Sequence, residues 1–174
     1  MKKRKVNLND IILLVLDVDG VLTDGTLILN PNGKESKAFN VHDGHGIRFW
    51  RRSGLKVAFL SGRQSEPTHL RAEQLEIEQC LENCKNKLPA LKKLLDDMKL
   101  EPRQAAFIGD DLPDIPAMRY VGFAVAVANA VKEVKDYADL VTKNCGGSGA
   151  VREAIEYILK KTGKWNEVMN RYTA

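Results

Sequence analysis

The sequence predicts an α/β fold in which a doubly wound parallel sheet lies between two layers of helices. Short apolar runs alternate with longer amphipathic stretches, and each apolar run ends in a polar or glycine-containing loop. Apolar runs of this length are typical of strands that are buried on both faces. Their alternation with helices favours parallel pairing, with helices on both sides of the sheet. We therefore expect a three-layer architecture.

Six strands and five helices are predicted from this pattern. The strong strands are expected at residues 11–16, 56–60, 105–108 and 123–127, and weaker ones near residues 77–81 and 140–142. The helices are expected at residues 44–53, 66–75, 88–98, 112–120 and 149–160. The series contains no internal repeat and no low-complexity segment.

One stretch breaks the alternation directly after the first strand. Residues 30–33 read Asn-Pro-Asn-Gly, a strong turn signal between two extended stretches. We expect a short β-hairpin insert over residues 26–40. A large cap domain is not expected, because one helix and one strand account for residues 61–87. The prediction is one domain over residues 1–174, with a C-terminal tail at 162–174.

Composition bounds the class of protein. A chain of 174 residues with 44% hydrophobic and 29% charged residues suits one soluble globular domain. The net charge of +4 (27 basic and 23 acidic residues) includes a basic run at residues 2–5, which we interpret as a solvated tail rather than a nucleic-acid site. The apolar run at 11–16 is too short for a membrane span or a signal peptide, so a cytoplasmic location is expected. The three cysteines of the chain lack a metal-ligand pattern and are interpreted as reduced structural thiols.

Acidic and hydroxyl residues follow three of the predicted strands. Asp17 and Asp19 come directly after the first strand, Ser61 follows the second strong one, and Asp110 comes soon after the third. In doubly wound sheets, ligands bind beyond the carboxyl ends of the strands. Carboxylates gathered there would repel one another without a cation, and an oxygen-only donor set selects Mg²⁺. The sequence therefore predicts a magnesium site at this edge.

Asp17 differs from the other acidic residues of these loops. It ends a six-residue apolar run and should be partly buried, where an unpaired carboxylate is costly. On an extended chain, Asp17 and Asp19 would point the same way, so that one carboxylate can attack while the other handles protons. Asp24, Asp111 and Asp114 also fit the helix N-caps that Asp often forms after a strand. Asp111 and Asp114 remain candidates for the site under either interpretation.

The segment at residues 17–24 (Asp-Val-Asp-Gly-Val-Leu-Thr-Asp), together with Ser61, Lys87 and the Gly-Asp-Asp at 109–111, resembles the four-motif set of the haloacid dehalogenase (HAD) superfamily. Order and spacing match across residues 17–114. The resemblance implies a Rossmann-like, HAD-like sheet and hydrolysis of a phosphate ester.

The same resemblance implies a role for each motif residue. Asp17 would be the nucleophile and Asp19 the general acid and base. Ser61 would bind the transferring phosphoryl group, and Lys87 would neutralise its charge. Asp110 would complete Mg²⁺ coordination with Asp17 and the backbone carbonyl of Asp19. An acid at the position of Asp19 is what phosphatases need and dehalogenases do not.

A closer resemblance covers almost the whole chain. Residues 19–25, the hairpin, residues 61–63 and the glycine-rich segment 146–153 are similar to the 3-deoxy-D-manno-octulosonate 8-phosphate (KDO 8-P) phosphatases of lipopolysaccharide synthesis. The resemblance implies a capless cytosolic enzyme that acts on a sugar-acid phosphate. It also implies a homotetramer in which a neighbour partly covers each active site, with neither nucleic acid nor membrane as a partner.

The match departs from that family at two positions. Ser61 replaces the usual threonine and keeps the hydroxyl. Ser148 stands where an arginine is common, which leaves the exact sugar acid open.

The expected substrate-binding set is Ser61, Gly62, Arg63 and Lys87. Arg63 is a candidate contact for the substrate carboxylate and favours the eight-carbon sugar acid over a related nine-carbon keto-deoxy sugar acid.

Two other classes of protein share parts of this pattern. A phospho-acceptor receiver also has a doubly wound sheet, but its acidic pair and its acceptor lie on different strands. A non-catalytic HAD-fold binding subunit would have lost Asp17 or Asp19, and both are present. Residues 146–149 fit either a flexible loop leading into the last long helix or a mobile segment that brings the tail to a neighbouring site. Trp165 and Tyr172 in the tail are expected to be packing aromatics.

Overall fold

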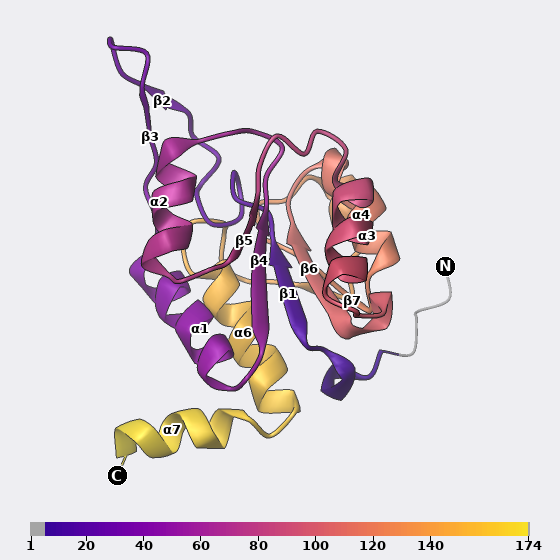
Figure 1. Ribbon diagram of the computed structural model, residues 1–174. Helices are drawn as coiled ribbons and strands as arrows, with labels where there is room; N and C mark the ends of the chain where they lie inside the picture. The colour runs from indigo at the N-terminus through magenta and orange to yellow at the C-terminus, as the bar shows by residue number, and fades with distance from the viewer. Residues whose placement is uncertain (1–5, 174) are drawn as a thin grey trace.

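A six-stranded parallel sheet forms the centre of the computed structural model, which describes residues 6–173 (Figure 1). The strands run in the order β5-β4-β1-β6-β7-β8, and every pair is parallel. Their bounds are β1 (Leu13–Leu16), β4 (Lys56–Leu60), β5 (Gln79–Leu81), β6 (Ala105–Gly109), β7 (Phe123–Ala126) and β8 (Leu140–Val141). All six predicted strands are therefore confirmed. The basic run at 2–5 lies outside the described residues.

Strand β1 occupies the middle of the sheet. Leu13 pairs with Lys56 of β4 on one side and with Ala105 of β6 on the other. The four residues of β1 are fully buried, as expected for a strand covered on both faces. The chain builds β4 and β5 on one side of β1 and then crosses over to β6, so the carboxyl ends of β4, β1 and β6 meet around the point where the strand order reverses.

Helices cover both faces of the sheet, which confirms the doubly wound architecture. Helices α1 and α6 pack together on one face, and α3 and α4 pack together on the other (Figure 1). The helices are α1 (Val41–Arg52), α2 (Glu66–Gln74), α3 (Lys87–Asp97), α4 (Ile115–Tyr120), α5 (Lys132–Lys135), α6 (Ala150–Lys161) and α7 (Trp165–Thr173). None of the helices within residues 6–173 combines the length and apolar character that a membrane crossing needs.

The helix predicted at 112–120 is divided in the structure. A 3₁₀ turn, η3 (Leu112–Asp114), comes before α4, and Pro113 and Pro116 stand near the two starts. A reciprocal capping box between Asp111 and Asp114 closes the 3₁₀ turn. The boundary in the middle of the predicted helix therefore comes from capping chemistry that apolar periodicity does not reveal.

The predicted hairpin is present but smaller than expected. Strands β2 (Ile28–Leu29) and β3 (Glu35–Ser36) pair antiparallel over two residues each, and Gly33 takes φ +78° in the turn between them. Figure 1 shows the pair projecting beyond α2, away from the main sheet. Leu27, Ile28 and Leu29 expose 48%, 46% and 67% of their surface. The hairpin therefore presents an uncovered apolar stretch.

The tail forms helix α7, which was not predicted. Its aromatic residues pack around Phe49 of α1, with ring centroids 6.0 Å away for Trp165 and 5.8 Å away for Tyr172. Both therefore pack as expected. In Figure 1, α7 lies at the end of the molecule opposite the hairpin. Helix α7 has nine residues and buries one apolar side chain, Val168.

Candidate active site

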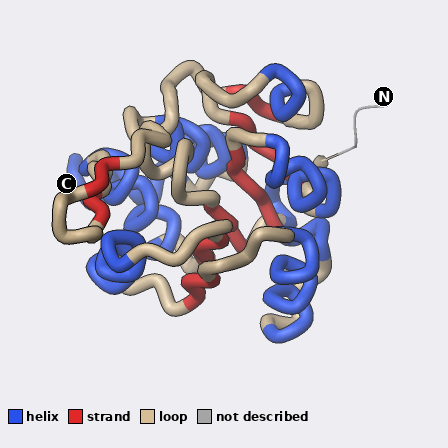
Figure 2. The backbone as a smooth tube through the Cα atoms, turned by 90° about the horizontal axis from the view of Figure 1, so that it is seen from above, coloured by secondary structure: helices blue, strands red, loops and turns tan. Residues whose placement is uncertain are grey.

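Most of the predicted site residues lie in the segments that follow the carboxyl ends of β1, β4 and β6, and Lys87 begins α3. Figure 2 looks onto this end of the molecule, where loops lie over the ends of the strands. The loop after β1 begins at Asp17, the loop after β4 at Ser61, and the loop after β6 at Asp110. The fold thus brings together residues far apart in the sequence, at the edge where a doubly wound sheet binds its ligands.

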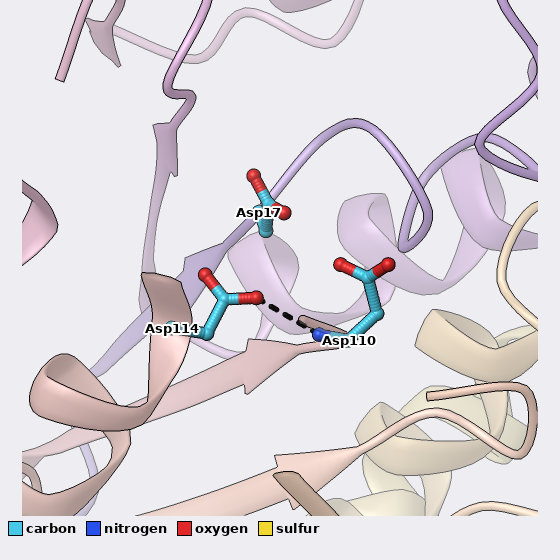
Figure 3. A group of neighbouring side chains, drawn as sticks. All are labelled: Asp17, Asp110 and Asp114. Carbon is cyan, nitrogen blue, oxygen red and sulfur yellow. Dashed lines mark hydrogen bonds between the residues drawn. The ribbon is translucent and has the colours of Figure 1, made fainter. Parts of the chain in front are cut away.

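Three carboxylates form the centre of the site. Each of Asp17, Asp110 and Asp114 offers an oxygen within 4.8 Å of the other two (Figure 3). Oδ2 of Asp114 accepts the backbone N–H of Asp110 at 2.9 Å and that of Asp111 at 3.2 Å. This carboxylate therefore folds the loop after β6 back on itself and faces Asp17 at the same time. We call these three residues the acid cluster.

Lys87, the first residue of α3, supplies a positive charge to the acid cluster. Its Nζ lies 2.7 Å from Oδ1 of Asp17 and 2.5 Å from Oδ1 of Asp114, and its side chain is only 4% exposed. Burial lowers the pKa of Lys87, but the carboxylates of Asp17 and Asp114 outweigh burial and leave that pKa above its ordinary value. Lys87 is therefore held in its charged form between two acids.

One lysine does not balance three carboxylates. Burial first, and then repulsion from Asp114, raise the pKa of Asp17 well above its ordinary value, although Lys87 acts in the opposite direction. Burial and Asp114 likewise raise the pKa of Asp110 to about 6. With all three acids ionised, the cluster and Lys87 together carry two excess negative charges. Such a site is short of positive charge.

The acid cluster has the properties of a divalent-cation site. Oδ1 of Asp110 is buried and, among residues 6–173, meets no hydrogen-bond donor. The atoms that the cluster offers to a cation are all carboxylate oxygens, the ligands that Mg²⁺ prefers. The cluster therefore fits the predicted magnesium site. Asp114, which the sequence marks only as a further candidate, is part of this site because its carboxylate lies next to those of Asp17 and Asp110.

The side chain of Asp19 faces a different partner. Strand β1 ends at Leu16, and the chain turns from residue 19, with Gly20 at φ +89°, so the strand does not continue to Asp19. Among the described residues, the Asp19 carboxylate joins no acid cluster. Its Oδ1 lies 2.7 Å from Nζ of Lys37, in the segment that follows β3. Asp19 is thus only two residues from Asp17 in the sequence, but its side chain is held by Lys37 of the hairpin insert.

The loop after β4 holds three of the predicted substrate-binding residues, Ser61, Gly62 and Arg63. Ser61 is buried, and its Oγ accepts the backbone N–H of Arg63 at 3.2 Å. Gly62 lies between them, where an added Cβ would meet only the carbonyl oxygen of Cys84, at 3.9 Å. The guanidinium of Arg63 is 46% exposed and pairs with Glu35 of the hairpin at 2.6 Å. The loop therefore offers a buried hydroxyl and a cation that solvent can reach.

Several other candidate residues lie outside the acid cluster. Asp111 is exposed and caps η3 through the N–H of Leu112, so the capping interpretation explains it. Asp24 accepts the N–H of Thr26 in a local turn. Asp24 thus has a local structural role, and Asp111 is tied to the cluster by the capping box that it shares with Asp114.

The glycine-rich run at 146–149 packs tightly against the loop after β1. A Cβ on Gly146 would come within 1.8 Å of the carbonyl oxygen of Gly20, and one on Gly147 within 2.6 Å of the backbone nitrogen of Asp24. Asp43, buried on α1, accepts the N–H of Gly149 at 3.2 Å. Of the two interpretations considered, these contacts favour a loop leading into α6, in which the glycines allow close backbone approach.

Lys37 and Glu35 were missed by sequence reasoning. Lys34 and Lys37 lie three residues apart in one short polar segment, yet the side chain of Lys34 is 68% exposed and that of Lys37 only 2%. The difference arises because Lys37 lies between the loop after β1 and Thr68 of α2, to which it donates a hydrogen bond at 3.1 Å. No local sequence signal marks which of the two lysines becomes buried.

Fold and site together define a haloacid dehalogenase-like hydrolase, and the sequence profile of that class matches residues 81–155. The chain is 44% identical over 155 residues to the 3-deoxy-D-manno-octulosonate 8-phosphate phosphatase KdsC of Escherichia coli (strain K12), a match that covers 89% of this chain and 82% of that protein. Within the hydrolase class, the chain therefore belongs to the 3-deoxy-D-manno-octulosonate 8-phosphate phosphatase family.

Solved structures agree with this assignment. The 3-deoxy-D-manno-octulosonate 8-phosphate phosphatase of Moraxella catarrhalis, in complex with a magnesium ion, a phosphate ion and a KDO molecule, superposes with a TM-score of 0.93 at 38% identity over 95% of each chain. The cobalt-bound enzyme from Haemophilus influenzae gives a TM-score of 0.87 at 39% identity, over 90% of this chain and 92% of that chain. The doubly wound HAD fold predicted from sequence is thus confirmed.

Proposed function

We propose that this chain is a magnesium-dependent phosphatase that hydrolyses a sugar-acid phosphate through a phosphorylated Asp17. The observation that carries the proposal is the buried carboxylate of Asp17, in contact with Lys87 and clustered with Asp110 and Asp114. A nucleophile needs to be ionised and held still, and the Lys87 contact favours both. The family relationship gives independent support.

In the first step, a carboxylate oxygen of Asp17 attacks phosphorus, and the bond from phosphorus to the sugar oxygen breaks. Asp19 gives its proton to the departing alkoxide, which leaves as an alcohol. In the second step, a water molecule attacks the phosphoryl group on Asp17, and Asp19 takes a proton from that water. Inorganic phosphate leaves, and both carboxylates return to their starting forms.

The other residues bind and balance charge. Lys87 neutralises charge on the equatorial phosphoryl oxygens, and the Ser61 hydroxyl donates a hydrogen bond to one of them. Asp17, Asp110 and the backbone carbonyl of Asp19 would hold Mg²⁺, with Asp114 close enough to support the site. When bound, Mg²⁺ supplies positive charge that offsets the negative charge of the phosphoryl group.

We propose the eight-carbon sugar acid 3-deoxy-D-manno-octulosonate 8-phosphate as the substrate. The named relatives act on or bind this compound or its product. The partly exposed guanidinium of Arg63 is a suitable partner for the carboxylate of a sugar acid, because guanidinium and carboxylate pair in a bidentate geometry. The related nine-carbon sugar acid is the alternative, since Ser148 leaves out the arginine that the family commonly carries there.

A phosphate-release screen over sugar phosphates in the presence of Mg²⁺ tests this proposal. The eight-carbon sugar-acid phosphate should give the highest kcat/KM, ahead of its nine-carbon relative and of neutral hexose phosphates. Release from neutral sugar phosphates at an equal rate would overturn the assigned substrate but leave the phosphatase chemistry standing. No release from any phosphate ester, aryl phosphates included, would overturn the function and leave a non-catalytic binding subunit.

Assembly and location are part of the proposal. We infer that residues 1–174 act as a single phosphatase domain and associate as a homotetramer through the hairpin insert at 26–40. The exposed side chains of Leu27, Ile28 and Leu29 support this, because contiguous apolar surface at a short exposed hairpin is usually covered. A cytoplasmic location likewise stays a prediction from the sequence.

A further inference from the structure

We propose that Lys37 is a positioning residue for Asp19: it fixes the direction in which the Asp19 carboxylate transfers its proton. The inference rests on the proposed function, in which Asp19 is the general acid and base. It adds a residue from the hairpin insert, so that an element outside the main sheet controls one part of the chemistry.

The contacts of Lys37 place it between the loop after β1 and helix α2. Its Nζ lies 2.7 Å from Oδ1 of Asp19, in the loop after β1, and donates to Oγ1 of Thr68 on α2 at 3.1 Å. Thr68 is fully buried, and the Lys37 side chain is 2% exposed. An ammonium group held by two fixed partners and shielded from water has little freedom to move. The oxygen that it contacts is therefore fixed as well.

Distances show which acid Lys37 serves. Glu35 is also near, but its Oε1 lies 3.8 Å from Nζ, compared with 2.7 Å for Asp19. The other oxygen of Glu35 is engaged by Arg63 at 2.6 Å. Although burial acts to raise the pKa of Glu35, the Ser65 hydroxyl, Lys37 and Arg63 bring it below its ordinary value. Glu35 is thus an ionised neighbour that balances the buried charge of Lys37 while Lys37 bonds to Asp19.

A purely structural role does not explain this arrangement. The Asp19 side chain is 30% exposed and can be solvated without a lysine, whereas burying a lysine costs its hydration. The hairpin has a separate surface contact with α2, between Lys34 and Glu66 at 3.6 Å. The buried lysine sets the direction of proton transfer, because it occupies Oδ1 of Asp19 and leaves Oδ2 to carry the proton.

The direction of proton transfer from Asp19 matters for departure of the leaving group in the first step. A departing alkoxide of high basicity needs a proton as its bond breaks, and proton transfer requires donor and acceptor to be aligned. An aryl phosphate with a good leaving group does not need that proton. Loss of Lys37 should therefore slow alkyl phosphates far more than activated aryl phosphates, whereas general damage to the site would slow both.

The test compares Lys37→Met with wild type on the sugar-acid phosphate and on an activated aryl phosphate. Methionine keeps the length of the side chain and removes the charge. We expect kcat for the alkyl ester to fall about 10–100-fold, part of the total that general acid catalysis contributes, and kcat for the aryl ester to change less than about 3-fold. Lys34→Met is the matched control, since Lys34 lies exposed on the same hairpin, and should leave both rates near wild type.

Three further variants separate positioning from folding. In an Asp19→Asn background, adding Lys37→Met should change the alkyl rate less than about 2-fold, because a residue that acts through Asp19 has nothing left to position. Lys37→Arg should recover part of the alkyl rate. Thr68→Val removes the second partner of Lys37. It should lower the rates less than Lys37→Met does, and the loss should again be larger for alkyl than for aryl esters.

Equal losses on alkyl and aryl esters in Lys37→Met, or an undiminished further loss in the Asp19→Asn background, would overturn the positioning role. Neither result would touch the phosphatase assignment, which depends on Asp17. If Lys37→Met does not fold, the Thr68→Val variant decides the question by the same ratio of alkyl to aryl rates, and an unchanged ratio there would count against the proposal.

Discussion

The acid cluster and the hairpin lie at the same end of the sheet but are built in opposite ways. Asp17 and Asp114 are buried, and the cluster is held by Lys87 and by strand ends in the middle of the sheet. The hairpin has two-residue strands and an exposed apolar stretch. A rigid scaffold suits groups that must keep their geometry during reaction, and an exposed insert suits contacts with a substrate or a neighbour. The two regions should therefore fail in different ways when altered.

The largest effect is expected at the centre of the acid cluster. Asp17→Asn should reduce turnover by at least about 10³-fold, because the amide keeps the shape of the side chain but is a poor nucleophile. The loss should be equal for sugar-acid and aryl phosphates. Phosphate release measures the rate, and circular dichroism checks the fold. More than a few per cent of wild-type activity in a folded variant would rule out Asp17 as the nucleophile.

A second change in the cluster should act through the metal. Turnover should stop with a chelator and return with Mg²⁺, and Asp110→Asn should raise the Mg²⁺ concentration for half-maximal activity at least about 10-fold. The matched control is Asp111→Asn, at an exposed neighbour outside the cluster, which should leave the Mg²⁺ requirement close to wild type. Activity that survives exhaustive chelation would contradict the metal site.

Changing the hairpin should alter assembly and selectivity instead. Replacing residues 27–36 with a short turn should give monomers by light scattering, because the exposed apolar residues are removed. Asp17 and Lys87 stay in place, so aryl phosphates should still be hydrolysed, while the preference for the sugar-acid phosphate falls about 10-fold or more. A monomeric wild-type protein at micromolar concentration with its preference intact would refute the proposed tetramer.

The smallest effect concerns pH and the stability of the metal-free protein. The folded-state pKa of Asp110, about 6, lies above its ordinary value of 3.8, so folding favours the protonated acid. Its contribution is full below about pH 4 and is lost as the pH rises through about 6. With EDTA, Tm should fall by about 2–4 °C more between pH 5 and pH 7.5 in wild type than in Asp110→Asn. Identical slopes in the two proteins would contradict the raised pKa.

Most of the acid cluster could be predicted because its residues lie where the chain leaves buried strands. Asp17 and Asp110 each follow an apolar run, and parallel strands bring such positions to one edge. Asp114 was harder to place, since its spacing fits a helix cap equally well. In the structure it both caps η3 and contacts Lys87, so a choice between the two roles was not needed.

The hairpin side of the site could not be predicted in the same way. The contact from Lys37 to Asp19 depends on how a two-residue-strand insert lies across α2, which neither periodicity nor turn chemistry fixes. The same holds for Arg63 and Glu35, which come from different elements. The turn at Asp19 was not predicted, because the sequence does not show that the chain stops being extended directly after β1.

The contact between Gly146 and Gly20 limits how this enzyme can change during evolution. Backbone meets backbone there, and the 1.8 Å approach of a Cβ on Gly146 shuts out every larger residue. The loop after β1 and the glycine run are thus packed backbone against backbone, and a side chain at Gly146 would push that loop out of place. Side chains that can vary in size without such a clash lie at the rim, in the hairpin and at Arg63, where we expect changes of substrate preference to arise.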